Sequence, residues 1–207
     1  MCGRYSIILP PEAILHLFQT HGELPNWPAY YNAHRPLRCL SCARRRTAAI
    51  VSSLMQWALT PWFSKDGKPP FSTINARASR SRRIAASCRR RDTSNGPARR
   101  TTDSRTTSPA PMVTQWRSPV CGPLARKDKS ETKETFTIVT TAPSAFAAQF
   151  HDRMPCVLEM EDVQGWLPAS PDHAAALMKP ANEDVPVSWP VNKAVGNVKN
   201  NTPDLLA

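Results

Sequence analysis

Residues 136–141 read Phe-Thr-Ile-Val-Thr-Thr and carry the clearest strand signal of the 207-residue chain. All but the first are β-branched, a residue type that fits a pleated, half-buried surface. Residues 142–150 then predict a helix with Pro143 near its first turn, which places His151 just past the helix's C-terminal end. A second strand is expected from Met154 to Met160. This strand–helix–strand run is the best-defined part of the predicted fold.

Shorter elements of both kinds surround that run. Pro10 and Pro11 begin a helix over residues 12–18 that has an acidic residue in its first turn and apolar residues on one face, namely Ile14, Leu17 and Phe18. The other expected elements are a loop at 25–28, a strand at 50–57, and short helices at 162–167 and 171–178, the last capped by Ser170. Strands and helices that do not alternate regularly indicate an α+β fold.

Size and composition bound the class of protein. We expect a single domain over residues 1–207, because this length suffices for one hydrophobic core. The first nine residues lack a secretory signal, and no stretch approaches the roughly 18 apolar residues of a membrane span. We therefore expect a soluble cytoplasmic protein that is nucleoid-associated if bacterial.

The six cysteines do not resemble a disulfide framework, which intracellular proteins rarely use. Cys39 and Cys42 have the spacing of half a zinc site, but Cys88 and Cys121 are single cysteines far apart in the sequence. We therefore expect neither a metal nor another cofactor. Cys156, between Pro155 and an apolar pair, is expected to be a small buried hydrophobic residue.

The positive charge of the chain lies in two segments. Residues 34–49 hold five arginines and no acid, and residues 79–126 hold eleven arginines and two acids. Together they contribute +14 to a net charge of +11, so the rest of the chain sums to −3. One explanation is that compensating frameshifts bracket each segment, since Arg-, Ser- and Pro-rich runs without hydrophobic periodicity are typical of a GC-rich gene read out of frame. The alternative is a genuine basic insert that binds phosphates nonspecifically.

Cys2 stands at a chemically distinctive position. Removal of Met1 would leave an α-amine with an ordinary pKa of about 8 and a thiol near 8.5 on adjoining carbons. The amine can form a Schiff base with an aldehyde, and the sulfur can then close a five-membered thiazolidine. An internal cysteine cannot do this.

Short motifs in a fixed order strengthen this interpretation. They are Met-Cys-Gly-Arg-Tyr at 1–5, Trp-Ala-Leu-Thr-Pro-Trp at 57–62, Ile-Asn-Ala-Arg-Ala at 74–78, His-Asp-Arg-Met-Pro at 151–155 and Gly-Trp-Leu at 165–167. In that order they resemble the SOS-response-associated peptidase family, also called abasic-site processing proteins. The resemblance is carried by residues 1–33, 51–78 and 127–207.

The resemblance implies a mixed, barrel-like sheet with short flanking helices, and a protein that crosslinks covalently to abasic sites in single-stranded DNA through Cys2. It implies an autoprocessing peptidase and lyase that acts as a monomer, with single-stranded abasic DNA as its partner and no membrane. Asn75 would position the sugar and His151 would shuttle a proton. The residues implied to contact DNA are Arg4, Arg77 and Arg153 at phosphates and Trp62 and Phe63 at bases, although both aromatic residues could equally belong to the core.

The middle of the chain departs from the family pattern. The family's catalytic glutamate has no counterpart, because no Glu lies between Glu23 and Glu131. Steps that need a carboxylate should therefore suffer most. Apolar residues are sparse in 79–126, so this segment is expected to build no ordered structure and to leave the sheet disrupted. Two other functions remain open: a noncatalytic basic nucleic-acid binder and an inactive family member.

Overall fold

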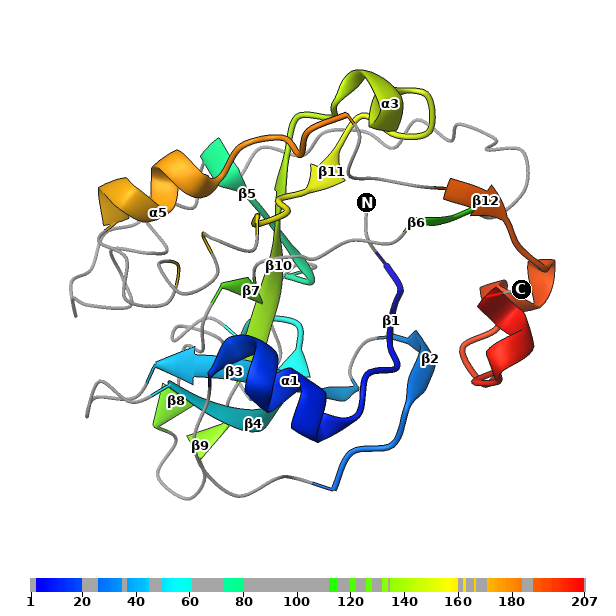
Figure 1. The fold of residues 1–207 in the computed structure, drawn as a ribbon, viewed down its shortest axis with the longest axis horizontal. Coiled ribbons are helices and arrows are strands. Elements are labelled where there is room, and N and C mark those ends of the chain that lie inside the picture. Colours follow the sequence, from blue (N-terminus) through cyan, green and yellow to red (C-terminus); the bar gives the residue numbers. More distant parts are fainter. Residues whose placement is uncertain are drawn as a thin grey trace.

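The computed structural model describes residues 3–19, 26–34, 37–44, 50–60, 73–79, 112–114, 120–121, 126–127, 132–133, 135–159, 162, 166, 171–183 and 188–206. Short helices surround a mixed sheet (Figure 1), which confirms the α+β class. No helix within these ranges is long and apolar enough to cross a membrane.

The strands are β1 (Tyr5–Ile7), β2 (Tyr30–Ala33), β3 (Arg38–Arg44), β4 (Ile50–Trp57), β5 (Asn75–Arg77), β6 (Met112–Thr114), β7 (Val120–Cys121), β8 (Arg126–Lys127), β9 (Thr132–Lys133), β10 (Thr135–Thr141), β11 (Met154–Pro155) and β12 (Ser188–Pro190). The α-helices are α1 (Pro11–Phe18), α3 (Ala145–Ala148) and α5 (Pro171–Leu177), and the 3-10 helices are η2 (Lys193–Gly196) and η3 (Pro203–Leu206).

Strand β10 organises the main sheet. It pairs in parallel with β4 and β5 and in antiparallel fashion with β7 and β11. Ile138 is in register with both β5 and β7, so these two strands lie on opposite edges of β10. Residues 135–140 are all buried, as expected for a strand with both faces covered.

Alternate residues of β10 enter different hydrophobic clusters. Phe136 and Ile138 pack with a cluster that includes Trp27 and Trp57, whereas Val139 packs with Cys156, with Ala174 of α5 and with Met178. This is the two-residue period of a strand. The rings of Trp57 and Phe136 stack with centroids 6.4 Å apart. Trp57 and Cys156 are both 0% exposed, which confirms Cys156 as a buried residue and shows that Trp57 also belongs to the core.

Several predicted elements are confirmed with small changes at their ends. The strand at 50–57 has the expected bounds, the first helix begins at Pro11, and the helix after Ser170 spans Pro171–Leu177. The strand predicted from 136 begins one residue earlier. The helix predicted over 142–150 is reduced to Ala145–Ala148, where the Ser144 side chain accepts a hydrogen bond from the amide of Ala147. Ser170 itself, and all of 162–167 except Asp162 and Trp166, lie outside the described residues.

The strand predicted from Met154 to Met160 is wrong at residues 156–159, and Met160 lies outside the described residues. Cys156, Val157 and Leu158 are all buried, each in a different hydrophobic cluster. Consecutive residues that are buried in three directions cannot keep the alternating pattern of an edge strand. The amide of Cys156 still donates to Val139 O over 2.9 Å, so the chain stays beside β10 for one more residue.

The two basic segments contribute strands. From the first, β3 pairs with β4 over its whole length, from Arg38 opposite Gln56 to Arg44 opposite Ile50. From the second, β7 pairs with β10 and β6 pairs with β12. The prediction that 79–126 builds no ordered structure is therefore wrong at 112–114, at 120–121 and at Arg126, where β8 begins; most of its remainder lies outside the described residues. Strand pairing uses backbone groups, so a segment poor in apolar side chains can still extend a buried sheet.

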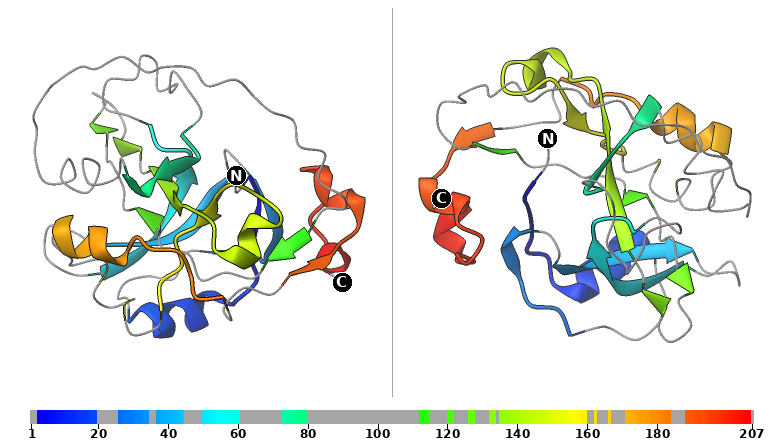
Figure 2. Two further views of the ribbon diagram at one scale, coloured as in Figure 1. Left: turned by 90° about the horizontal axis from the view of Figure 1, so that it is seen from above. Right: turned by 180° about the vertical axis from the view of Figure 1, so that it is seen from behind.

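The C-terminal segment lies beside the first strands. Helix η3 contacts β2, and the red C-terminal ribbon runs next to the blue β1–β2 pair in the views from above and behind (Figure 2). Helix α5 lies on the far side of β10 from the C-terminal segment (Figure 1).

Candidate functional site

A short helix leads directly into His151. Its first turn is capped by Ser144, and its first two amides, of Ala145 and Phe146, donate to the two carboxylate oxygens of Glu183 over 2.8 and 2.9 Å. These hydrogen bonds lower the pKa of Glu183. The amide of His151 donates to Ala147 O over 3.0 Å, so α3 holds the backbone of His151 in place.

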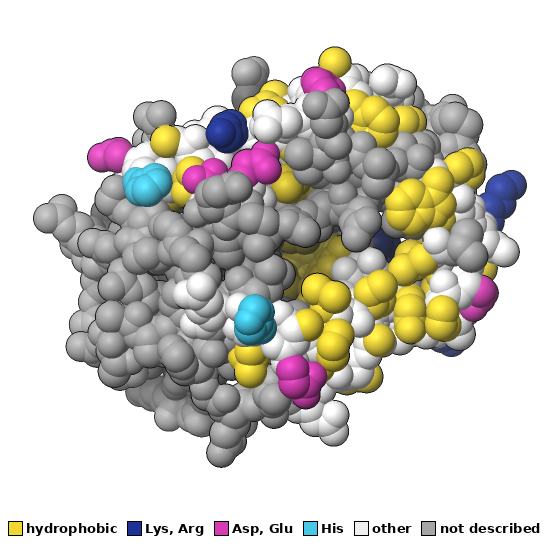
Figure 3. Space-filling model, viewed as in Figure 1, with side chains coloured by type: hydrophobic (Ala, Val, Ile, Leu, Met, Phe, Trp, Pro, Cys, Tyr) yellow, Lys and Arg dark blue, Asp and Glu magenta, His cyan; other side chains and the backbone are white. Residues whose placement is uncertain are grey.

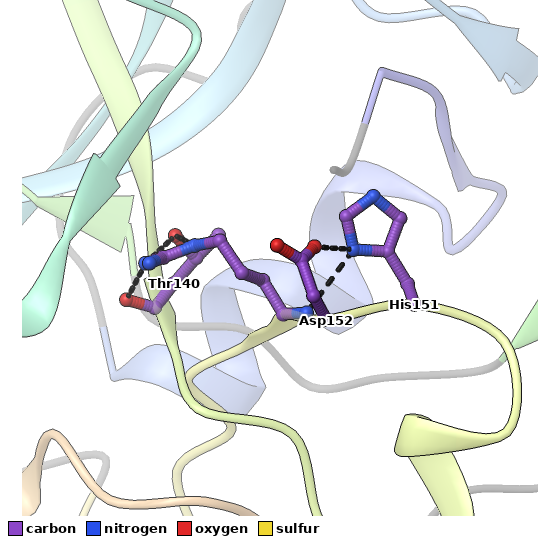
Figure 4. A network of polar contacts seen from close by, with 4 residues as sticks. Thr140, His151 and Asp152 are labelled. Carbon is purple, nitrogen blue, oxygen red and sulfur yellow. Dashed lines mark hydrogen bonds and ion pairs between the residues drawn. The ribbon is translucent and has the colours of Figure 1, made fainter. Parts of the chain in front are cut away.

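The imidazole of His151 has two polar neighbours at one nitrogen (Figure 4). Its Nδ1 lies 2.6 Å from an Asp152 carboxylate oxygen and accepts from the amide of Arg153 over 3.1 Å. The carboxylate favours a proton on Nδ1, whereas the amide needs the lone pair there. Because the two contacts favour opposite protonation states, the ring can both hold and release a proton at this position.

Burial is the largest influence on the pKa of His151 and lowers it. The positive charge of the chain's N-terminus lowers this pKa further, as does Arg153, while Asp152 opposes them. The imidazole is therefore neutral at neutral pH.

Two arginines meet around Thr140. Arg153 donates from Nη2 to the Thr140 carbonyl and hydroxyl oxygens over 2.7 and 2.6 Å, and from Nε to the same hydroxyl over 3.1 Å (Figure 4). Arg77 is in register with Thr140 across the β5–β10 pair. Burial and the nearby charge of Arg77 lower the pKa of Arg153, but a guanidinium stays charged at any physiological pH. Two adjacent cations of this kind favour an anion between them.

Strand β5 aligns two of the predicted site residues. Asn75 and Arg77 are two positions apart in a strand, so their side chains leave the same face. Asn75 is in register with Ile138. The register brings Arg77 close to Arg153 and places Asn75 one pleat further along the same strand.

Arg4 is held by protein acceptors. Its Nη1 donates to Asn32 Oδ1 over 2.8 Å and to the carbonyl of Val195, and its Nη2 donates to the carbonyl of Gly196 over 2.7 Å. The guanidinium therefore joins β1 to β2 and η2. Of the other predicted site residues, Cys2, Trp62 and Phe63 lie outside the described residues.

Some residues with a part in this region carried too weak a signal in the sequence. Thr140 reads as one of many β-branched residues in a strand, and Asn32 and Glu183 read as ordinary polar residues far from the motifs. Asp152 is the easiest of these residues to predict from the sequence, because it stands between His151 and Arg153 in the same motif. Among the described residues no group of three or more acidic, histidine or cysteine side chains is placed to hold a metal ion.

One face of the molecule is hollowed. Figure 3 shows a depression near the middle of this face, with hydrophobic and basic side chains among the described residues at its walls. On the described part of this face, acidic and basic side chains are scattered and form no patch of one sign (Figure 3).

Curated relatives align along the whole chain. The abasic site processing protein YoqW of Bacillus subtilis (strain 168) is 27% identical over 231 residues, which cover 100% of this chain and 99% of that protein. YoaM of the same organism, which has the same description, is 26% identical over 100% of this chain and 97% of that protein. YedK of Escherichia coli (strain K12), also so described, is 37% identical over 91 residues, 41% of this chain and 38% of that protein.

Solved structures share the fold. A protein from Bacteroides thetaiotaomicron superposes with a TM-score of 0.71 at 16% identity, over 99% of this chain and 98% of that one. A phage-related protein from Bordetella bronchiseptica superposes with a TM-score of 0.64 at 18% identity, over 93% and 95% of the two chains.

The family profile described as SOS response associated peptidase (SRAP) matches residues 1–87 and 93–198. The match runs through residues 34–49 and through all of 79–126 except 88–92, and so extends further than the short motifs do. With nearly the whole chain matched, this protein belongs to the SOS response associated peptidase family.

Proposed function

We propose that this protein captures abasic sites in single-stranded DNA by forming a thiazolidine at Cys2, and so shields the lesion during the response to DNA damage. One observation carries the proposal: Arg77 lies close to Arg153, whose amide donates to the imidazole of His151, and the chain's N-terminal charge helps to lower the pKa of that histidine. The relatives described as abasic site processing proteins support the choice of substrate. Such DNA is found in the cytoplasm, at the nucleoid in a bacterium, and we propose that the protein acts there as a monomer.

The proposed reaction proceeds in two steps. After Met1 is removed, the Cys2 amine attacks the aldehyde carbon of the ring-opened sugar and water leaves, which gives a Schiff base. The thiol then adds across the C=N bond: a C–S bond forms and the thiol proton passes to nitrogen. One water is lost overall, and no oxidant or cofactor is needed.

His151 is suited to the ring opening that exposes the aldehyde. A general acid–base group works best when its pKa lies near the operating pH. A neutral imidazole can accept a proton from the sugar hydroxyl, and the imidazolium that results can protonate the ring oxygen. Asp152, 2.6 Å away, would stabilise that imidazolium. Asn75 would orient the sugar, because an amide side chain both donates and accepts.

Arg77 and Arg153 would bind phosphates next to the abasic site. Arg77 is exposed, and Arg153 is half-buried and held in place by Thr140, so the second guanidinium is pre-organised. Trp62 and Phe63 would stack on neighbouring bases. Because the family glutamate has no counterpart in the sequence, we propose that release of the crosslink and strand cleavage are slower than capture. Autoprocessing here would remove Met1 alone.

The test is incubation with single-stranded DNA that contains one abasic site, followed by a denaturing gel. We expect a heat-stable shifted band with the unmodified chain, and none with Cys2→Ala or with intact DNA. Absence of the band from a folded, Met1-processed chain would overturn the proposal. Retention of binding by Cys2→Ala, with a steep salt dependence and no crosslink from either chain, would instead indicate a basic nucleic-acid binder.

A further inference from the structure

The contacts of Arg4 form part of a closed network. Asn32, whose Oδ1 accepts from Arg4, is 2% exposed, and its Nδ2 donates to the carbonyls of Val195, Asn197 and Asn200 over 3.1, 3.0 and 3.0 Å. Arg4 also donates to the first of these carbonyls. The two side chains together thus bind a single stretch of backbone in residues 192–201, here called the Asn-rich segment.

Further asparagines hold the segment in shape and against β2. Asn192 Oδ1 accepts from the amide of Ala194, and Asn200 Nδ2 donates to the carbonyl of Ala194. Asn201 Oδ1 accepts from the amides of Tyr31 and Asn32 over 2.8 and 3.2 Å. The Asn-rich segment is therefore a rigid acceptor surface, and Arg4 is the residue that ties β1 to it.

We propose that Arg4 is a positioning residue: by joining β1 to the Asn-rich segment, it fixes the direction from which the reacting N-terminus enters the site. The proposal rests on the proposed function, because the group being positioned is the Cys2 amine and thiol. Only Gly3 separates Arg4 from Cys2, so loss of the anchor would move the nucleophile directly.

This role differs from a phosphate contact by Arg4. A guanidinium fork recognises phosphate when its paired donors point at the ligand. In Arg4 both terminal nitrogens already donate to protein acceptors, across contacts that bridge about 190 residues of sequence. Moreover, the partner Asn32 is buried and cannot touch DNA, so a shared phenotype of variants at these two positions would reflect positioning.

His151 offers an independent readout of where the chain begins. Its pKa is lowered by burial, by the N-terminal charge and by Arg153, and raised by Asp152. Arg4→Lys keeps the charge at position 4 but cannot reach several carbonyls with a planar fork. If this substitution lets the N-terminus move away from His151, the pKa of His151 must rise, because a repelling positive charge is removed.

The experiment compares Arg4→Lys, Asn32→Ala and the control Lys193→Ala, which removes an exposed charge from the same segment. Three quantities are measured: the crosslinking rate at saturating abasic DNA, the affinity for intact single-stranded DNA at several salt concentrations, and the pKa of His151 by NMR titration. We expect both network variants to lose about tenfold or more in rate, the order expected when a reacting group is displaced. Affinity and its salt slope should stay unchanged, and the pKa of His151 should rise. The control should match the unmodified chain in all three.

A wild-type rate for Arg4→Lys would overturn the proposal. So would a rate loss that vanishes at saturating DNA and comes with a salt slope smaller by about 0.7, which is the signature of one lost phosphate contact. If Asn32→Ala does not fold, Arg4→Lys decides alone. If the unmodified chain forms no crosslink, the proposed function fails; the titration in Arg4→Lys still shows whether Arg4 holds the N-terminus beside His151.

Discussion

At the scale of single residues, two buried threonines of β10 should respond in opposite ways to the same substitution. The Thr140 hydroxyl accepts from Arg153 and donates to Ala76 O over 3.2 Å, whereas the Thr137 hydroxyl is buried with no hydrogen-bond partner among the described residues. Both side chains are 1% exposed. Replacing a hydroxyl by a methyl of similar shape costs stability only where a partner is left unsatisfied.

We therefore expect Thr140→Val to lower the free energy of unfolding by about 1–3 kcal/mol, because it strips two contacts from a half-buried guanidinium. Thr137→Val should leave stability unchanged or raise it. Urea unfolding monitored by tryptophan fluorescence measures both. Equal destabilisation by the two variants would mean that the hydroxyl contacts of Thr140 add nothing to the hydrophobic packing of the strand.

At the scale of elements, α3 depends on a carboxylate from a distant segment. Glu183 accepts from the first two amides of the helix, and these hydrogen bonds lower its pKa in the folded chain. A carboxylate whose pKa is lower when folded stabilises the fold above its unfolded pKa, near 4.3 in model peptides. That contribution is lost as the pH falls through the folded pKa.

Glu183→Gln should therefore lower the melting temperature near pH 7, and the difference from the unmodified chain should shrink as the pH falls below about 4. Thermal melts across this range measure it. Asp204→Asn, which removes an exposed negative charge from η3, is the matched control. If the gap between Glu183→Gln and the unmodified chain is the same at every pH, the charge of Glu183 has no part in holding α3.

The elements also show how far local sequence predicts this fold. Strand β4 has the bounds that its sequence predicted, and α1 begins at the expected proline, because these signals are contained in the segments themselves. The failures come from partners elsewhere in the chain. The strand that begins at Met154 ends at Pro155 because the next three residues pack in different clusters. Strand β7 forms because it can pair with an edge of β10.

At the scale of the whole molecule, the site residues were predictable as residues but their grouping was not. His151 and Arg153 share one motif, but their proximity to Arg77 depends on the register between β5 and β10. The anchoring of Arg4 depends on carbonyls at the other end of the chain, which carry no side-chain signal. Sequence thus proposed the candidate residues, whereas long-range strand pairing and the contacts of the C-terminal segment determine where the described ones lie.

Net charge is a property of the whole chain, and its distribution separates the residues expected to attract DNA from those expected to react with it. The segments 34–49 and 79–126 carry +14, whereas the rest of the chain carries −3. Arg89, Arg90 and Arg91 lie in the second segment, outside the described residues, and far in sequence from His151 and Arg153. We expect these three arginines to attract DNA without taking part in capture.

Replacing all three by glutamine should lower the salt slope of single-stranded DNA affinity by up to about 2, since each lost phosphate contact removes about 0.7. The crosslinking rate at saturating DNA should not change. Arg153→Gln is the contrasting variant, because it removes the guanidinium that Thr140 holds. It should lower the crosslinking rate at saturating DNA while changing the salt slope by at most about 0.7. If the triple variant instead loses crosslinking at saturating DNA, the basic segment belongs to the reactive site, and the separation of attraction from chemistry fails.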